Sequence, residues 1–407
     1  MQPRFHAPET VEDLADLLLG YAQEGLPVEV RGLGSKLGYG RPVQTAAVVS
    51  TEKFDEITLY EPSELVLSAG SGTPLAKIEK LLDENGQQLA FEPFDLPPVL
   101  GGKPGEGSIG GVFATGLSGS RRVLSGAARD HILGVKAVNG RGEAFKAGGR
   151  VMKNVTGYDL SKLLTGSCGT LSVLTEITMK VLPKPEQSST LLFFDVPEAA
   201  AIELLCKAMG SPFEVSGAAH LQPGLAAGLS DKPLRERAES VTALRVEGFE
   251  GAVRYRAAKL KQKFAAFSDL TELSGDRSRR FWSDIRQVRP LQSAGRPLWR
   301  ISTAPSRAAD LVAALRHTID LKALYDWSGG QIWLETGATS DANAVELRRI
   351  LADFGGYATL VRAEPGIRAS ADVFQPLEMR LMEITRALKA SFDPAGILNP
   401  GRMYSGV

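Results

Sequence analysis

The sequence predicts an α+β protein in which a glycine-rich, ligand-binding part precedes a second α+β domain. Short apolar runs with strand character alternate with amphipathic helical patterns along the chain. Of the 43 glycines, 26 lie in residues 1–183, which places the expected ligand-binding loops in that part. In residues 184–370, strands separated by single helices are typical of split βαβ units on one antiparallel sheet.

The first predicted elements are a helix and a strand. Thr10 and Asp13 are typical of a helix start and Gly25 of a helix end, with an apolar stripe between them. The strand PVEVRG leads into RGLGSKLGYG, which is either a surface turn or a phosphate cradle. A cradle is favoured because more glycine loops follow later in the chain. Its residues are Gly32, Gly34, Ser35 and Lys36.

The next predicted unit consists of a strand, a helix and a second strand. LVLSAGSG is the first strand. TPLAKIEKLLDENG is a helix that Thr73 caps, with Pro74 at its first position and Asn85 near its end. QLAFEP is the second strand.

The stretch from Gly101 to Pro183 is the most glycine-dense part of the chain. Its glycines are interleaved with Ser, Thr and Asn, which favours backbone wrapped around a flat anionic ligand over a merely loop-rich β region. ILGVKAV is a strand, and Asn139-Gly140 predicts a hairpin after it. A short helix is expected over 158–164, starting near Thr156, and another strand over 171–181.

The glycines Gly105, Gly107 and Gly110 also satisfy the GxGxxG pattern of dinucleotide-binding folds, with Asp130 about 20 residues further on. That pattern indicates such a fold only when it follows a strand. Here a proline-rich loop, PPVLGGKP, precedes it. A Rossmann domain is therefore disfavoured.

The second part of the chain supplies the remaining elements. Strands are expected at LLFFDV, VTALRVEG, LWRIST, ALYDW and QIWLE. Helices are expected at PEAAAIELLCKAM, GAVRYRAAKLKQKF, SRAADLVAALRHT and SDANAVELRRILADF. A last helix begins near PLEMRLMEITRALKASF and is followed by turns at Asp393-Pro394 and Asn399-Pro400.

Four motifs together resemble the vanillyl-alcohol oxidase (para-cresol methylhydroxylase, PCMH) type of FAD-binding protein. RGLGSK is similar to that family's pyrophosphate loop and SIGGVFATGLSG to its central flavin loop. KNVTGYDLSKLLTGSCGTLSVLTE is similar to the closing signature of the 2-hydroxyacid dehydrogenase branch, and FDPAGILNPGRM to the usual ending. The resemblance covers residues 26–183 and 371–403.

The resemblance implies a PCMH-type FAD-binding domain of two α/β subdomains over residues 1–183. An antiparallel-sheet α+β cap domain follows over 184–370, and a C-terminal helix and tail over 371–407 returns to the FAD domain. The first loop lacks the histidine that attaches FAD in some members, so non-covalent FAD is expected. Asn399 can equally belong to a simple C-terminal tail. The implied cofactor-binding residues are Arg31, Gly32, Gly34, Ser35, Lys36, Ala69, Gly70, Ser108, Ile109, Gly110, Gly111, Ala114, Thr115, Ser118, Gly119, Lys153, Asn154, Gly157, Tyr158, Gly166, Gly169 and Asn399.

Oxidation of a 2-hydroxy acid requires a base for the hydroxyl proton and a cation for the carboxylate, while the flavin accepts the hydride. In relatives an arginine just beyond a tryptophan holds the carboxylate, and Arg286 resembles it, although a surface arginine is an equal alternative. Asp326 and His220 are candidate bases. The sequence alone assigns none of these roles.

The resemblance also bears on a metal site. Related members hold a divalent metal with two histidines in a pattern close to HAGDGNLH. The best match is DWSGGQIW, in which Asp326 and Trp333 replace both histidines. Tryptophan is only a hydrogen-bond donor, and the four histidines show no metal-ligand spacing. No metal is expected.

Within its branch the chain is most similar to one of two flavoprotein-like subunits of a three-subunit glycolate-oxidising complex. This implies an FAD-dependent oxidoreductase that works with a sister flavoprotein catalytic subunit on a small 2-hydroxy acid. An iron–sulfur subunit would pass electrons to a non-oxygen acceptor, because two cysteines cannot hold a cluster. The alternatives are a self-sufficient dehydrogenase of another hydroxy acid or alcohol, and a non-catalytic scaffold.

The overall composition limits which cellular locations and which classes of binding partner are expected. Lys+Arg and Asp+Glu are both 47, so no basic field indicates a nucleic-acid partner. The start MQPRFHAPET is no secretory signal, and no apolar run is long enough to span a bilayer. We expect a cytoplasmic chain, or one held at the inner face of the cell membrane through its complex.

Overall fold

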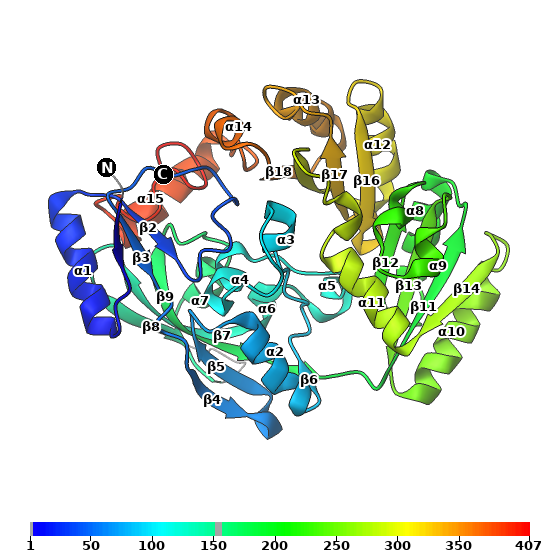
Figure 1. Ribbon diagram of the computed structural model, residues 1–407, viewed down its shortest axis with the longest axis horizontal. Coiled ribbons are helices and arrows are strands. Elements are labelled where there is room, and N and C mark those ends of the chain that lie inside the picture. Colours follow the sequence, from blue (N-terminus) through cyan, green and yellow to red (C-terminus); the bar gives the residue numbers. More distant parts are fainter. Residues whose placement is uncertain (1–2, 151–156) are drawn as a thin grey trace. The chain divides into compact units, whose positions relative to one another are not determined.

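The computed structural model describes residues 3–150 and 157–407, and it divides the chain into two compact units (Figure 1). Unit 1 comprises Met1–Leu117, Gly126–Lys184 and Pro376–Val407. Unit 2 comprises Ser118–Ser125 and Pro185–Gln375. The segment 118–125 therefore groups with the second unit, although it lies within the range expected for the FAD domain.

Unit 1 begins with a small parallel sheet in the order β1-β3-β2. Its elements are β1 (Arg4–His6), α1 (Val11–Glu24), β2 (Val28–Arg31) and β3 (Ala47–Ser50). The predicted helix ends are confirmed, because the Thr10 side chain accepts a hydrogen bond from the Asp13 amide and Gly25 has a φ of 64°. The strand β2 ends at the first glycine loop, so the sheet fixes where that loop starts.

A five-stranded antiparallel sheet is the larger sheet of unit 1, with the strand order β4-β5-β9-β7-β8. Its strands are β4 (Ile57–Glu61), β5 (Val66–Gly70), β7 (Ile132–Asn139), β8 (Ala144–Gly148) and β9 (Ser172–Lys180). The main helices with it are α2 (Leu75–Glu84), α4 (Ile109–Thr115) and α7 (Leu160–Leu164). Leu67, Val135 and Ile177 of this sheet share one apolar core with Ile78 of α2 and Phe113 of α4. The hairpin predicted at Asn139 is confirmed between β7 and β8.

Three local predictions in unit 1 were wrong in whole or in part. Thr73 does not cap α2, because its buried hydroxyl donates to the Glu56 carbonyl and Pro74 occupies the cap position. Of the expected strand QLAFEP only Gln88 lies in a strand, the two-residue β6 (Gln87–Gln88). The helix expected over 158–164 is present and ends at Leu164, but it starts two residues later than expected, at Leu160, capped by Asp159. Thr156 itself lies outside the described residues.

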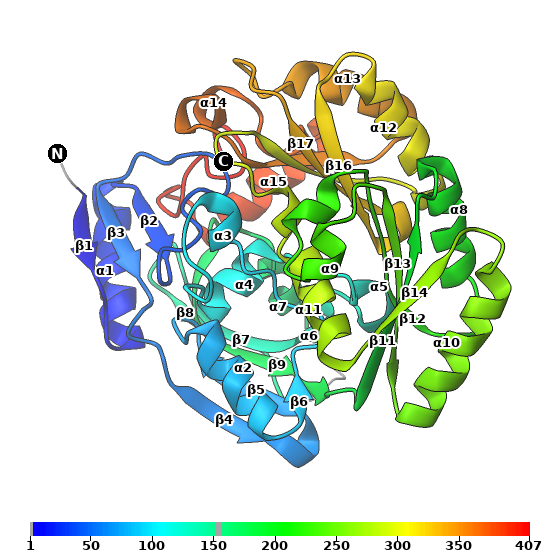
Figure 2. The same ribbon diagram turned by 45° about the vertical axis from the view of Figure 1, so that its right-hand side comes forward.

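Unit 2 contains one antiparallel eight-stranded sheet in the order β14-β11-β13-β12-β16-β17-β15-β18 (Figure 2). Its strands are β11 (Gln187–Phe194), β12 (Val215–Leu221), β13 (Val241–Gly248), β14 (Leu270–Ser274), β15 (Leu298–Ser302), β16 (Leu321–Asp326), β17 (Gln331–Thr336) and β18 (Tyr357–Arg362). Its longer helices are α8 (Glu198–Met209), α10 (Glu250–Phe264), α11 (Gly275–Arg286), α12 (Ala308–Arg316) and α13 (Ala344–Phe354). The expected antiparallel α+β arrangement of this part is confirmed.

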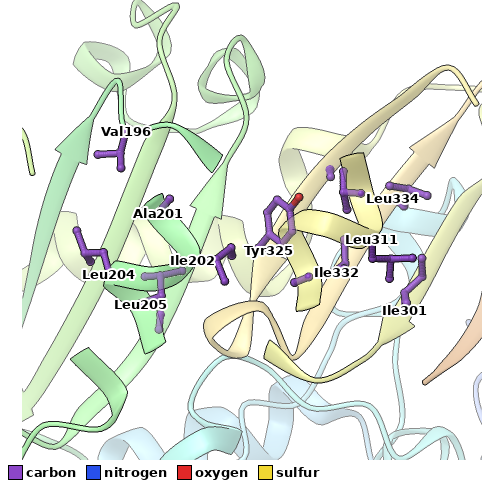
Figure 3. Close-up of a cluster of buried hydrophobic side chains, with 14 of the residues drawn as sticks. Val196, Ala201, Ile202, Leu204, Leu205, Ile301, Leu311, Tyr325, Ile332 and Leu334 are labelled. Atoms are coloured by element: carbon purple, nitrogen blue, oxygen red, sulfur yellow. The ribbon is translucent and has the colours of Figure 1, made fainter. Parts of the chain in front are cut away.

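One face of this sheet forms the main apolar core of unit 2. Ile301 of β15, Tyr325 of β16 and Ile332 of β17 pack there with residues of α8 and α12 (Figure 3). Successive side chains of a strand point to opposite faces. The alternate residues of these strands therefore lie on the other face of the sheet, where polar and charged side chains gather.

The C-terminal segment folds onto unit 1. After α15 (Met379–Phe392), the tail runs beside β2, where the Val28 amide donates to the Ile397 carbonyl at 2.8 Å. The Asn399 amide in turn donates to the Val28 carbonyl at 3.0 Å. The tail residues Ile397 and Asn399 are therefore hydrogen-bonded to β2, which lies near the start of the sequence. None of the helices within the described ranges is both long and apolar enough to cross a membrane.

Candidate cofactor site

Unit 1 contains a cavity of about 800 Å³, including the space open to solvent. Four segments form its wall: the end of β2 with the first glycine loop, the start of α4, the turn before β9, and the C-terminal tail. Twelve expected cofactor residues line it: Arg31, Gly32, Gly34, Ser35, Lys36, Ser108, Gly110, Gly111, Ala114, Thr115, Gly169 and Asn399.

Glycines make the wall possible at two close approaches, one to the Ser108 side chain and one to the Ser71 backbone. A Cβ on Gly32 would lie 2.2 Å from the Ser108 hydroxyl oxygen. A Cβ on Gly110 would lie 2.6 Å from the Ser71 carbonyl oxygen, to which the Gly110 amide donates at 2.7 Å. Neither separation is compatible with a side chain. Both glycines also line the cavity, so main chain with no Cβ is part of its wall, which suits an extended anionic ligand.

The charges of the wall favour an anion. Arg31, Lys36 and Arg402 line the cavity, and none of the described lining residues is acidic. Burial lowers the pKa of Lys36 to about 8, and Asp95 opposes that shift. Burial also lowers the pKa of Arg402, whose guanidinium donates to the carbonyls of the first loop. Three cations beside exposed backbone suit a pyrophosphate group.

The C-terminal tail contributes Asn399 to the wall. Its side-chain oxygen accepts from the Val30 amide at 2.9 Å, and its side-chain nitrogen donates to the Cys168 carbonyl at 2.9 Å. Asn399 and Cys168 both have positive φ, 41° and 53°. Asn399 thus ties the end of β2 to the turn before β9. Burial raises the pKa of the Cys168 thiol to about 12, so it is protonated at neutral pH.

Other expected cofactor residues lie outside the cavity wall. Ala69 is a core residue, and a Cβ on Gly70 would lie 2.2 Å from the Phe54 carbonyl, so both positions serve packing. Ile109 is fully buried in the core of unit 1, whereas Tyr158 is 91% exposed. Also outside the wall are Gly157, Gly166, Ser118 and Gly119. Lys153 and Asn154 are not among the described residues.

Ser118 and Gly119 do not line the cavity because hydrogen bonds hold their segment within unit 2. The Trp327 indole donates to the Gly119 carbonyl at 3.0 Å. The Arg121 guanidinium donates to both carboxylate oxygens of Glu247, at 2.9 and 3.0 Å. The flavin-loop motif SIGGVFATGLSG therefore divides after Leu117: its first part lines the cavity and its end belongs to the other unit.

Sequence reasoning missed part of the wall. Arg402 lies only three residues beyond Asn399 in the quoted ending FDPAGILNPGRM, and its charge was the signal that could have identified it. Tyr39 lies in the first loop's own sequence, RGLGSKLGYG. Thr51 and Ser71 carried no local signal, because only the folded sheets place them there.

The three candidate catalytic residues do not converge. The His220 ring packs against Tyr325 on the helix-covered face of the unit 2 sheet, with a hydrogen bond to Thr242 at 2.9 Å. Asp326 follows Tyr325 on the same strand and therefore points to the opposite face. Its two oxygens accept from the Ser120 hydroxyl and the Trp327 amide, both at 2.7 Å. Arg286 ends α11, elsewhere in the unit. Asp326 acts here as a turn cap.

The segment that matches the relatives' metal-binding pattern is a tight turn between β16 and β17. Trp327 and Ser328 adopt positive φ values of 52° and 63°. The Trp333 indole donates to the Gln331 side chain at 3.1 Å. In the described ranges, no group of three or more His, Cys, Asp or Glu side chains is arranged to hold a metal ion.

We expect acid to destabilise the protein partly through His220. Burial lowers its pKa to about 4, whereas an unfolded histidine titrates near ~6.5. Between these values the unfolded state binds a proton that the folded state does not, so the free energy of unfolding falls as pH falls. From pH 7 to 5 this amounts to about 2 kcal/mol. Urea unfolding at both pH values should show a smaller difference for His220→Gln than for the unmodified chain.

Lys36 predicts a pH-dependent affinity for FAD. We expect its ammonium form to attract the pyrophosphate, and with a pKa of about 8 in the free protein that form is lost as pH rises. Affinity should therefore fall between pH 7 and 9. Lys36→Met should weaken binding at pH 7 by about 10-fold and remove the pH dependence. Flavin fluorescence titration measures both, and Lys103→Met, an exposed lysine of the second glycine loop, should change neither.

The sequence also matches known families. The "FAD binding domain" family matches residues 3–148, and the "FAD linked oxidases, C-terminal domain" family matches residues 366–403. Glycolate oxidase subunit GlcE of Escherichia coli (strain K12) is 36% identical over 93% of both chains. A D-lactate dehydrogenase of Archaeoglobus fulgidus is 26% identical over 97% of this chain and 90% of its own.

Solved structures show the same fold. p-Cresol methylhydroxylase superimposes with a TM-score of 0.72 at 15% identity, covering 98% of this chain and 88% of its own. 4-Ethylphenol oxidase from Gulosibacter chungangensis gives a TM-score of 0.73 at 15% identity, covering 98% and 89%. These similarities confirm the PCMH-type α+β fold that the motifs predicted.

Proposed function

The chain belongs to the FAD-linked oxidase family that includes glycolate oxidase subunit GlcE, and on that premise we propose that it is the FAD-binding E-type subunit of a glycolate oxidase complex. It is an FAD-dependent oxidoreductase and uses FAD as its cofactor. The observation that carries the proposal is the cavity of unit 1, whose wall combines exposed glycine backbone with three cations.

The residues of that cavity fit FAD. The loop from Gly32 to Lys36 and the start of α4 at Gly110 and Gly111 would hold the pyrophosphate, with Arg402 adding a charge from the tail. When bound, FAD supplies a hydride acceptor for the carbon that bears the hydroxyl group. Among the described lining residues there is no histidine, which supports non-covalent attachment.

The partners follow from what the residues of this chain can do. In unit 2, Asp326 and Trp333 occupy the places of the relatives' metal-binding histidines and are engaged in hydrogen bonds within the fold. We therefore assign the metal-dependent oxidation of glycolate to glyoxylate to a sister flavoprotein subunit. An iron–sulfur subunit would carry electrons to a non-oxygen acceptor, with the complex in the cytoplasm or at the inner face of the cell membrane.

An anaerobic visible spectrum of the purified chain tests this proposal. We expect bound flavin that stays oxidised when glycolate is added and becomes reduced once the sister subunit is present. Bleaching by glycolate without the sister subunit would instead identify a self-sufficient dehydrogenase. A chain that remains colourless after incubation with FAD would not bind the cofactor. That result would contradict the proposal and favour a non-catalytic scaffold subunit.

A further inference from the structure

A half-buried arginine stands out on the polar face of the unit 2 sheet. Arg300 lies on β15 between Trp299 and Ile301, both of which point into the apolar core, so its side chain points to the other face. Its Nε is inaccessible to water, and within the described part of the chain no hydrogen bond or ion pair to its guanidinium is found. A buried donor of a charged group normally has a partner.

Neighbouring carboxylates do not supply that partner. Strands β13, β16 and β17 carry three carboxylates on this face. Asp326 accepts from Ser120 and from the backbone, as described above. Glu335 is paired with Arg362 at 3.1 Å, and Glu247 is held by the bidentate pair in unit 2. The negative charge on this face is therefore already engaged by other cations and donors.

Aromatic rings fix the position of the guanidinium. The Arg300 guanidinium carbon lies 5.6 Å from the centre of the Trp327 ring, and that of Arg122 lies 4.2 Å from the same ring. Trp333 is the register partner of Arg300 across the β15–β17 ladder. Two cations thus meet at one indole, beside a second indole. Stacking on a ring holds a guanidinium plane while leaving its outer nitrogen atoms available to a ligand.

We propose that Arg300, seated on Trp327, is the anchor of a binding site for a small carboxylate in unit 2, and that the ligand is a 2-hydroxy or 2-oxo acid of the size of glycolate. The choice of ligand rests on the proposed function, whereas the site itself rests on this chain's residues. A guanidinium presents two parallel N–H donors that match a carboxylate. The Trp327 ring at the guanidinium and Trp333 in register beside it favour a short acid over a bulky one. This chain would therefore bind the acid without a metal and without oxidising it.

Isothermal titration calorimetry of the FAD-loaded full chain with glycolate tests this site. We expect Arg300→Gln to weaken glycolate binding about 10- to 100-fold, and Arg300→Lys to weaken it less because it keeps the charge. Arg307→Gln is the matched control, since this exposed arginine stacks on Phe354 in the same unit without a role in the site. It should bind glycolate like the unmodified chain.

Two results would overturn the inference. One is equal glycolate affinity in Arg300→Gln and the unmodified chain, at unchanged urea midpoints. The other is tighter binding of inorganic phosphate than of glycolate, because the site is assigned to a carboxylate. The visible spectrum of the same samples reports bound FAD independently. Failure of the carboxylate site with flavin retained therefore differs from failure of the proposed function, in which flavin is absent.

Discussion

A leucine in place of Gly111 should abolish measurable FAD binding at micromolar concentrations while leaving the chain folded. A Cβ at this position would lie 3.1 Å from Nζ of Lys36, tighter than most real contacts, and the rest of the side chain would extend among the lining residues. The lysine is flexible and can move, so the helix itself survives. The ligand then loses both space and a cation. We expect an affinity loss of at least about 100-fold.

The matched control is Gly251→Leu in α10. Gly251 lies in the first turn of its helix, as Gly111 does in α4, but a Cβ there has no atom within 4 Å. Flavin fluorescence titration and urea unfolding should be measured on both variants. If Gly111→Leu bound FAD as tightly as Gly251→Leu, the cavity of unit 1 would not be the flavin site.

Features set by neighbouring residues could be predicted from the sequence. The helix α1 formed where its cap and its terminal glycine indicated, because the Thr10 hydroxyl oxygen accepts from the nearby Asp13 amide. The glycine loops could also be identified from neighbouring residues, since glycine permits positive φ and close backbone approach. The strands β11 and β13 followed from their apolar runs, and both are almost entirely buried.

Strands without a strong pattern were missed. The strand β12 reads VSGAAHL, and its small residues give no clear alternation, yet all seven are buried between β13 and β16. The strands β14 and β18 were not predicted either. Their place in the sheet depends on partners distant in sequence, so tertiary packing rather than local propensity decides them.

The candidate site could be predicted only where the motif itself forms the wall. Asn399 contacts Val30 across 369 positions of the sequence, and Arg402 reaches the carbonyl of Tyr39 across 363. No local pattern carries such information. Conversely, Ser118 and Gly119 continue the flavin-loop motif but are fastened within unit 2, because the Trp327 indole binds that segment. The flavin-loop motif thus predicted two residues, Ser118 and Gly119, that do not line the cavity. The C-terminal motif contains a lining residue, Arg402, that was not predicted.

Replacing Lys389 by methionine should cost about 3–5 kcal/mol of unfolding free energy. Its ammonium donates to the Asp393 carboxylate, the Thr170 carbonyl and the Leu398 carbonyl, at 2.7, 2.8 and 2.7 Å. Asp393 is only 1% exposed. Methionine keeps the side-chain length but leaves a buried carboxylate and two carbonyls without their shared donor. Urea unfolding measures the loss.

The exposed pair of Lys207 and Glu203 supplies the control for that substitution. It is also an i, i+4 pair, with the acid before the lysine, but its side chains are 54% and 59% exposed. Lys207→Met should therefore cost less than about 1 kcal/mol. Adding Asp393→Asn to Lys389→Met should recover part of the loss, because it removes the uncompensated charge. If both lysine variants lost the same stability, burial of the pair would not be what matters.

The Lys389 variant should also weaken FAD binding, although the lysine does not line the cavity. Its contacts fix the start of the tail that carries Asn399 and Arg402 into the wall. Any ligand that binds only the docked tail stabilises that arrangement by mass action, so excess FAD should raise the variant's unfolding midpoint. The free energy of unfolding and the affinity for FAD should both fall in Lys389→Met, and both should partly recover when Asp393→Asn is added. If stability were lost while the affinity for FAD stayed unchanged, the tail would be an attachment to the fold and not part of the cofactor site.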